Sequence, residues 1–139
     1  MDSLYVPPSA VDSVWDKASG YLEPAVALQD GYLMEDVKRM LLRGAWQLWV
    51  AVDDSNEMHA ASITRVDTYP RKRVMVINFL GGREMKNWKH LLGDIEDTAV
   101  QNGCTELEIQ GRKGWAREMK KEFTHTDVVC IKKIGGDNV

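Results

Sequence analysis

The apolar run from residue 73 to residue 80 constrains the fold of this chain most strongly. Its sequence is Arg-Val-Met-Val-Ile-Asn-Phe-Leu, and apart from Asn78 the residues after Arg73 are apolar in both alternating positions. Successive side chains of a strand point to opposite faces of a sheet, so a strand that is apolar on both faces is buried on both. The sequence therefore predicts a strand in the centre of a sheet.

The two segments before this run predict the neighbouring strands. From 46 to 52, the apolar side chains at 46, 48, 50 and 52 alternate with Gln47, Trp49 and Ala51. A second strand-like segment extends from Ala61 to Val66. A polar turn at 53–56 separates these two strands, and Pro70 ends the second. Because connections this short join antiparallel neighbours, we expect an antiparallel meander of three strands.

Apolar residues at helical spacing predict helices on both sides of the meander in the sequence. A first helix is expected from about Ala10 to Glu23, with Ser9 as its N-cap, and Pro24 should break or kink it. A second helix is expected from about Leu33 to Leu41. The other expected elements are a short strand at 4–6, a helix at 88–103, a strand at 104–109, a helix at 115–123 and a last strand at 128–134. The sequence thus predicts one α/β (α+β) domain over residues 1–139, with a mixed central sheet and about four helices.

Composition narrows the classes of function. The chain has 18 basic and 21 acidic residues, so its net charge of −3 argues against broad nucleic-acid binding, although the basic cluster at 71–73 leaves a local contact open. No apolar stretch approaches the ~20 residues of a membrane helix, and the N-terminus has no signal-like pattern, so we expect a cytoplasmic protein. Cys104 and Cys130 lie in apolar strand-like runs and are expected to be buried thiols.

The sequence offers few candidates for a metal or nucleophile site. His59, His90 and His125 are far apart and fit no metal-ligand spacing, so no metal is expected. Glu106 and Glu108 share one face of the strand at 104–109. Glu108 is a candidate general base if that face borders a cleft, and otherwise both carboxylates belong to the solvated face of a half-buried strand.

The central strand is followed at once by Gly81 and Gly82 and then by the helix at 88–103. A helix N-terminus has unpaired N–H donors and the positive end of the helix dipole, and glycines allow a phosphate to approach the backbone closely. These residues therefore indicate either an anion site or simply a tight turn.

The order of these elements resembles that of the GNAT fold, the Gcn5-related N-acetyltransferases, over nearly the whole chain. The resemblance implies that the loop after the central strand holds the pyrophosphate of acetyl-CoA. The matching residues would be Gly81, Gly82, Arg83, Lys86 and Asn87. The glycine spacing of the family is absent, and Glu84 would place a carboxylate close to the phosphates.

The resemblance also implies a general base and a tyrosine acid. Glu108 is the matching candidate base. The tyrosine that often serves as the acid follows the central strand in the family, whereas the four tyrosines here precede it, at 5, 21, 32 and 69. The missing tyrosine argues against the chemistry of the family in this chain.

Four short segments resemble GNAT-like proteins that tailed phages and prophages encode. They are residues 47–53, 69–73, 80–82 and 111–117. This resemblance implies a non-catalytic protein in the head–tail or tail region of a phage particle, with no required cofactor, located in the host cytoplasm or in the particle. Phage structural or assembly proteins would be its partners, and whether the chain also forms a homo-oligomer is left open. An aromatic interface would comprise Trp46, Trp49, Trp88 and Trp115. The alternative is an acyl-CoA-dependent N-acyltransferase.

Overall fold

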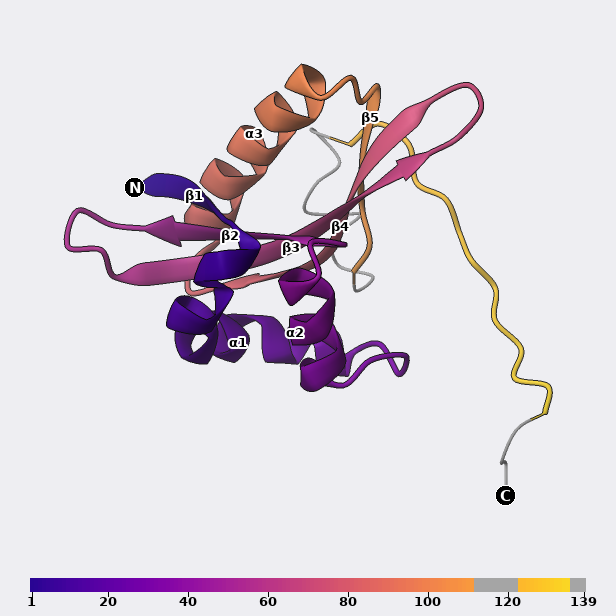
Figure 1. The fold of residues 1–139 in the computed structure, drawn as a ribbon. Helices are drawn as coiled ribbons and strands as arrows, with labels where there is room; N and C mark the ends of the chain where they lie inside the picture. Colours follow the sequence, from indigo (N-terminus) through magenta and orange to yellow (C-terminus); the bar gives the residue numbers. More distant parts are fainter. Residues whose placement is uncertain (112–122, 136–139) are drawn as a thin grey trace.

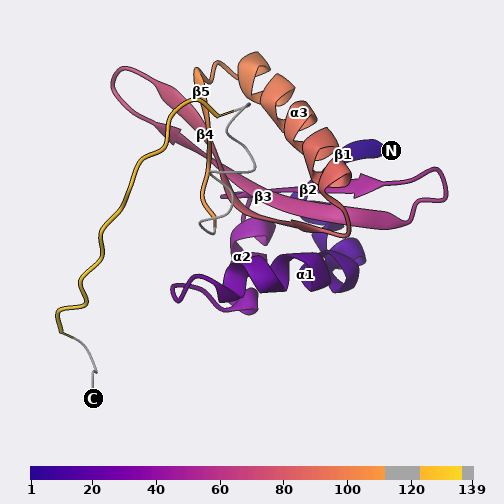
Figure 2. The same ribbon diagram turned by 180° about the vertical axis from the view of Figure 1, so that it is seen from behind.

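The computed structural model describes residues 1–111 and 123–135, with the side chains of Met85 and Trp88 left aside (Figure 1). A five-stranded sheet forms the middle of the molecule, and helices lie against its two faces (Figures 1 and 2). In chain order the elements are β1 (Asp2–Val6), a 3-10 turn η1 (Pro8–Ala10), α1 (Val11–Ala27), α2 (Met34–Leu42), β2 (Gln47–Val52), β3 (Met58–Thr68), β4 (Arg73–Gly82), α3 (Met85–Gln101) and β5 (Glu106–Ile109).

The sheet follows the chain in the order β1-β2-β3-β4-β5. The first four strands are antiparallel, and β5 runs parallel to β4 after the crossover through α3. The predicted meander and mixed sheet are therefore confirmed. Within the described residues there are three α-helices, and the predicted helix at 115–123 lies almost wholly outside them.

Two separate cores cover the two faces of the sheet. One lies between the sheet and helices α1 and α2, and the other lies between the sheet and α3. β4 contributes side chains to both cores. Asn78 is an extra residue in its ladder, since Ile63 pairs with Phe79 while Thr64 pairs with Ile77. This bulge places Phe79 in the core under α1, whereas Ile77 lies in the core under α3.

Pro24 does not end the first helix, contrary to the prediction. Helix α1 continues through it to Ala27. A proline removes one helical hydrogen bond, but Leu22 and Val26 on either side of it are fully buried against the sheet. Burial of these side chains outweighs the lost bond.

The C-terminal segment also differs from the prediction. Residues 124–134 are extended but form no strand, and Val128, Val129, Ile131 and Ile134 are exposed. Cys104 is buried as expected, whereas the expectation for Cys130 is wrong because this thiol is exposed. A strand needs a partner to satisfy its backbone, and none of the described strands pairs with residues 124–134.

No helix of the described part of the chain has both the length and the apolar character that crossing a bilayer requires.

Candidate functional site

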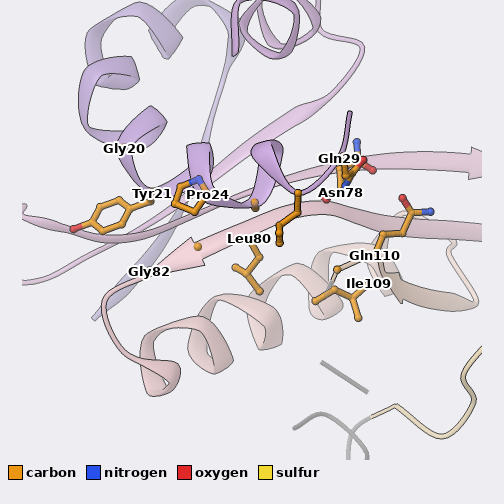
Figure 3. Close-up of a pocket in the computed structure, with 13 residues that line it drawn as sticks. Gly20, Tyr21, Pro24, Gln29, Asn78, Leu80, Gly82, Ile109 and Gln110 are labelled. Carbon is orange, nitrogen blue, oxygen red and sulfur yellow. Dashed lines mark hydrogen bonds between the residues drawn. The ribbon is translucent and has the colours of Figure 1, made fainter. Parts of the chain in front are cut away.

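A cavity of about 780 Å³ lies between helix α1 and the end of β4 (Figure 3). Helix α1 and the residues after it form one wall, and β4 forms the other together with the end of β5 and the two residues that follow it. The lining residues are Gly20, Tyr21, Pro24, Ala25, Leu28, Gln29, Asn78, Leu80, Gly81, Gly82, Ile109, Gln110 and Gly111. Both the predicted glycines therefore border the cavity.

The cavity exists because β4 and β5 separate. The two strands pair only from Val74 to Ile77, and the last bond between them joins the Gln110 amide to the Ile77 carbonyl at 3.1 Å. Beyond this point β4 continues to Gly82. Residues 78–82 of β4 therefore have no strand beside them on the cavity side in the described part of the chain.

Gly81 allows helix α1 to approach β4 closely. A Cβ atom at this position would lie 2.0 Å from the carbonyl oxygen of Tyr21, a distance that requires the backbone to move. The absence of a side chain at Gly81 therefore serves the packing of α1 on the sheet. This role agrees with the simpler interpretation of the glycine pair, in which the glycines serve the backbone geometry.

Arg83 already forms hydrogen bonds with other residues of the protein. Its backbone N–H donates to the carbonyl of His59 at 3.0 Å, and its side chain donates to the Tyr21 hydroxyl at 2.7 Å and to Glu57 Oε1 at 2.8 Å. The Tyr21 hydroxyl in turn donates to the Met58 carbonyl at 2.9 Å. The guanidinium lowers the pKa of the Glu57 carboxyl through this hydrogen bond and through its charge. To contact a phosphate, Arg83 would have to share its donors with these partners.

The remaining predicted cofactor residues lie at the start of α3. The helix begins at Met85, three residues earlier than predicted, and Glu84 occupies the N-cap position without a side-chain capping bond. Lys86 Nζ lies 3.3 Å from Glu84 Oε2, so the two exposed charges offset each other. Asn87 is buried, and its backbone N–H donates to the Glu84 carbonyl at 3.0 Å. The first turn contains no acidic residue.

Glu108 is exposed and lies outside the lining of the cavity. Its carboxylate accepts a hydrogen bond from Gln110 Nε2 at 3.0 Å, and Glu106 accepts one from Lys72 at 3.0 Å. Leu107 and Ile109 alternate with the two carboxylates and pack on the core under α3. This arrangement matches the alternative interpretation, in which the glutamates form the solvated face of the strand.

The structure describes the side chains of two of the four candidate interface tryptophans. Trp46 is 6% exposed and packs in the core under α1 and α2, in edge contact with Tyr32 and Phe79. Trp49 is 7% exposed and belongs to the core under α3, where its Nε1 donates to Thr64 Oγ1 at 3.0 Å. These two rings lie in separate cores, so together they form no exposed patch. The side chain of Trp88 and the whole of Trp115 lie outside the description.

The hairpin between β2 and β3 brings together three potential metal ligands, which their sequence spacing had not suggested. Ligand atoms of Asp53, Glu57 and His59 lie within 4.8 Å of one another. Each is already engaged: His59 Nε2 lies 2.8 Å from Asp53 Oδ2, the other Asp53 oxygen accepts the N–H groups of Ser55 and Glu57, and Glu57 accepts from Arg83. The hydrogen bond from His59 is the main reason that the pKa of Asp53 is lowered to about 2. These groups stabilise the hairpin.

Sequence reasoning did not identify the α1 wall of the cavity. Figure 3 shows Gln29 beside Asn78 and the Tyr21 ring at the far end, with its hydroxyl directed away from the other labelled residues. Gln29 Nε2 donates to the Asn78 carbonyl at 3.4 Å. Asn78 carried a signal, since it is the one polar residue within the apolar part of the central run. Nothing in the helical pattern distinguishes Gln29 or Tyr21 from surface residues.

Comparison with known proteins supports the fold assignment. No family model and no curated protein matches this sequence. Solved structures match nearly the whole chain. An aminoglycoside acetyltransferase from an uncultured soil metagenomic sample has a TM-score of 0.71 and 14% identity, covering 96% of this chain and 95% of its own.

Two further acetyltransferases agree with this match. The ribosomal-protein-alanine N-acetyltransferase of Brucella melitensis has a TM-score of 0.70 and 12% identity, covering 97% of this chain and 99% of its own. A GNAT family acetyltransferase of Staphylococcus aureus has a TM-score of 0.67 and 13% identity, covering 96% and 98%. The chain has the GNAT fold. The predicted fold class is thereby confirmed, while the resemblance to phage proteins stays a prediction.

Proposed function

We propose that this chain is an N-acetyltransferase that uses acetyl-CoA. The observation that carries the proposal is the cavity at the separation of β4 and β5, in a chain whose structural neighbours are acetyltransferases. Fold by itself does not specify function, so the proposal rests on how well the residues of this cavity suit the cofactor.

The pantetheine arm of acetyl-CoA is a chain with two amide groups, and the unpaired edge of β4 suits it. Residues 78–82 present backbone N–H and C=O groups with no strand beside them on the β5 side, in the described residues. An extended ligand can pair with such an edge as an additional strand would. Gly82 borders the cavity just before α3, so a ligand paired with β4 would have its phosphates close to the first turn of the helix.

The cofactor would supply an acetyl thioester. In the transfer, the nitrogen of a neutral amine attacks the thioester carbonyl carbon, the carbon–sulfur bond breaks, the nitrogen loses a proton, and the CoA thiolate gains one. The side-chain amides of Gln29 and Gln110 lie in the lining and can orient the acceptor by hydrogen bonds. Tyr21 is the one described lining residue with a titratable side chain, and its hydroxyl points away from the cavity. Water is therefore the proposed route for the protons.

Release of free CoA thiol from acetyl-CoA tests the proposed activity directly. The purified protein would be incubated with acetyl-CoA and a panel of primary amines, including amino acids, N-terminal peptides, polyamines and aminoglycosides. We expect amine-dependent thiol release with at least one acceptor, together with acetylated product by mass spectrometry. Loss of this release in a Gly82→Glu variant, which places a carboxylate beside the proposed phosphate site, would support the location. Absence of thiol release with all acceptor classes would contradict the activity.

The alternative role, contact with phage particle proteins, has less support. Two of its four candidate residues, Trp46 and Trp49, are buried in the cores. The solved structures compared above are acetyltransferases. We therefore favour the enzyme over the structural protein.

A further inference from the structure

The last described segment exposes apolar side chains on an extended chain. Val128, Val129, Ile131 and Ile134 are between 78% and 82% exposed. Figures 1 and 2 show this segment leaving the molecule near β5 and extending beyond the loop between α1 and α2. Proteins usually cover apolar side chains that lie together, so a surface that receives this segment is expected.

One ion pair identifies that surface. Lys133 Nζ lies 2.8 Å from Asp30 Oδ2, and this interaction lowers the pKa of the Asp30 carboxyl. Asp30 belongs to the loop between α1 and α2, directly after Leu28 and Gln29, which line the cavity. The segment is thus attached within two residues of the rim of the cavity.

The alternation of an extended chain would place two apolar residues on the side of the ion pair. In a fully extended backbone, alternate residues share one face, so Val129 and Ile131 would face the same side as Lys133 when the segment packs as an extended strand. The loop offers exposed apolar side chains there, because Leu28 and Leu33 are each 64% exposed. Leu28 is both exposed and part of the cavity lining, so it lies at the opening.

We propose that residues 128–134 form a strap that packs across the opening of the cavity onto Leu28 and Leu33, with the Asp30–Lys133 ion pair as its anchor. In the structure Lys133 contacts Asp30 while Val129 and Ile131 are exposed, so the proposed packing would require these two side chains to move onto the loop. Closing the strap would cover Leu28 and restrict entry to the cavity. The strap depends on the cavity and the loop, and it does not require the chain to be an acetyltransferase.

Disulfide trapping tests the strap. In a Cys130→Ser background, Leu28→Cys and Ile131→Cys are combined, and disulfide formation under mild oxidation is followed by mass spectrometry and by mobility on non-reducing gels. The matched control combines Ile131→Cys with Val100→Cys, because Val100 is 67% exposed on α3, across the sheet from α1. Both substituted side chains are exposed in each pair, so folding should be retained, and a thermal melt of the reduced proteins checks this.

We expect the Leu28 pair to form an intrachain disulfide at least about tenfold faster than the Val100 pair. Adding Lys133→Glu should slow the Leu28 pair several-fold, and adding Asp30→Lys to that variant should restore the rate. Equal rates for the two pairs would show that the segment has no preferred surface and would overturn the proposal. Disulfides between chains, or no effect of Lys133→Glu, would also overturn it. Because no acetyl-CoA is present, the result is independent of the proposed activity.

Discussion

At Gly81 the β4 backbone has no room for a side chain. Gly81→Ala would place a methyl group 2.0 Å from the Tyr21 carbonyl oxygen, so α1 would have to move away from the sheet. We expect the free energy of unfolding to fall by about 1–3 kcal/mol, as for other overpacked interiors. Urea unfolding of the variant measures this change.

Gly93→Ala is the matched control at the residue scale. Gly93 lies inside α3, and apart from its chain neighbours and the backbone of its own helix, no atom of the described residues lies within 4 Å of a Cβ built there. Alanine is favoured over glycine within a helix by roughly 0.5–1 kcal/mol, so this variant should be more stable than the wild type. If both variants shifted stability in the same direction, the close approach at Gly81 would not be the cause.

The hairpin between β2 and β3 links stability to pH at the scale of an element. The pKa of Asp53 is about 2 in the folded protein, below its ordinary value of 3.8, chiefly because of the hydrogen bond from His59. A carboxyl whose pKa is lowered by folding stabilises the folded state above its unfolded pKa. This contribution is lost as the pH falls from about 4 towards 2.

Unfolding free energies measured between pH 6 and pH 2.5 test this link. We expect Asp53→Asn to be less stable than the wild type at pH 6, with the difference shrinking as the pH falls through 4. Asp54→Asn changes the exposed neighbour in the same turn and should retain the pH dependence of the wild type. A stability difference for Asp53→Asn that is the same at pH 6 and pH 2.5 would show that the carboxylate charge is not responsible.

Local patterns predicted the elements of the sheet more fully than they predicted the site. The alternation of residues 46–52 and the continuous apolar run at 73–80 are properties of neighbouring residues, and they located β2 and β4 closely. The contact of Arg83 with Tyr21 joins residues 62 positions apart, so no local pattern contains it. The glycine pair was predicted because its signal is local. The α1 wall was not predicted, because it depends on how α1 packs on β4.

The C-terminal segment also shows that a local sequence pattern does not specify long-range contacts. Its apolar, β-branched residues favour a strand at 128–134, yet no described strand pairs with it. Strand propensity reflects how well a residue fits a pleated surface, and it supplies no partner. The candidate interface tryptophans are comparable, because Trp46 and Trp49, the two of the four whose side chains are described, lie in the cores.

At the scale of the whole molecule, α1 on one face and the separation of β4 from β5 together create the cavity. The fold around it matches acetyltransferases of known structure. Acetyl-CoA would contact both walls of this cavity, so its binding should stabilise the entire domain. A ligand present at 100 times its dissociation constant adds about 2.7 kcal/mol to the free energy of unfolding.

Thermal unfolding with and without acetyl-CoA tests this central claim most directly. Wild-type protein should melt roughly 5–15 °C higher at a saturating concentration. Gly82→Glu should lose the shift, whereas Val100→Glu, which adds the same charge at an exposed position on α3, should keep it. An unchanged melting temperature for the wild type in millimolar acetyl-CoA, or an undiminished shift in Gly82→Glu, would contradict the proposed cofactor site.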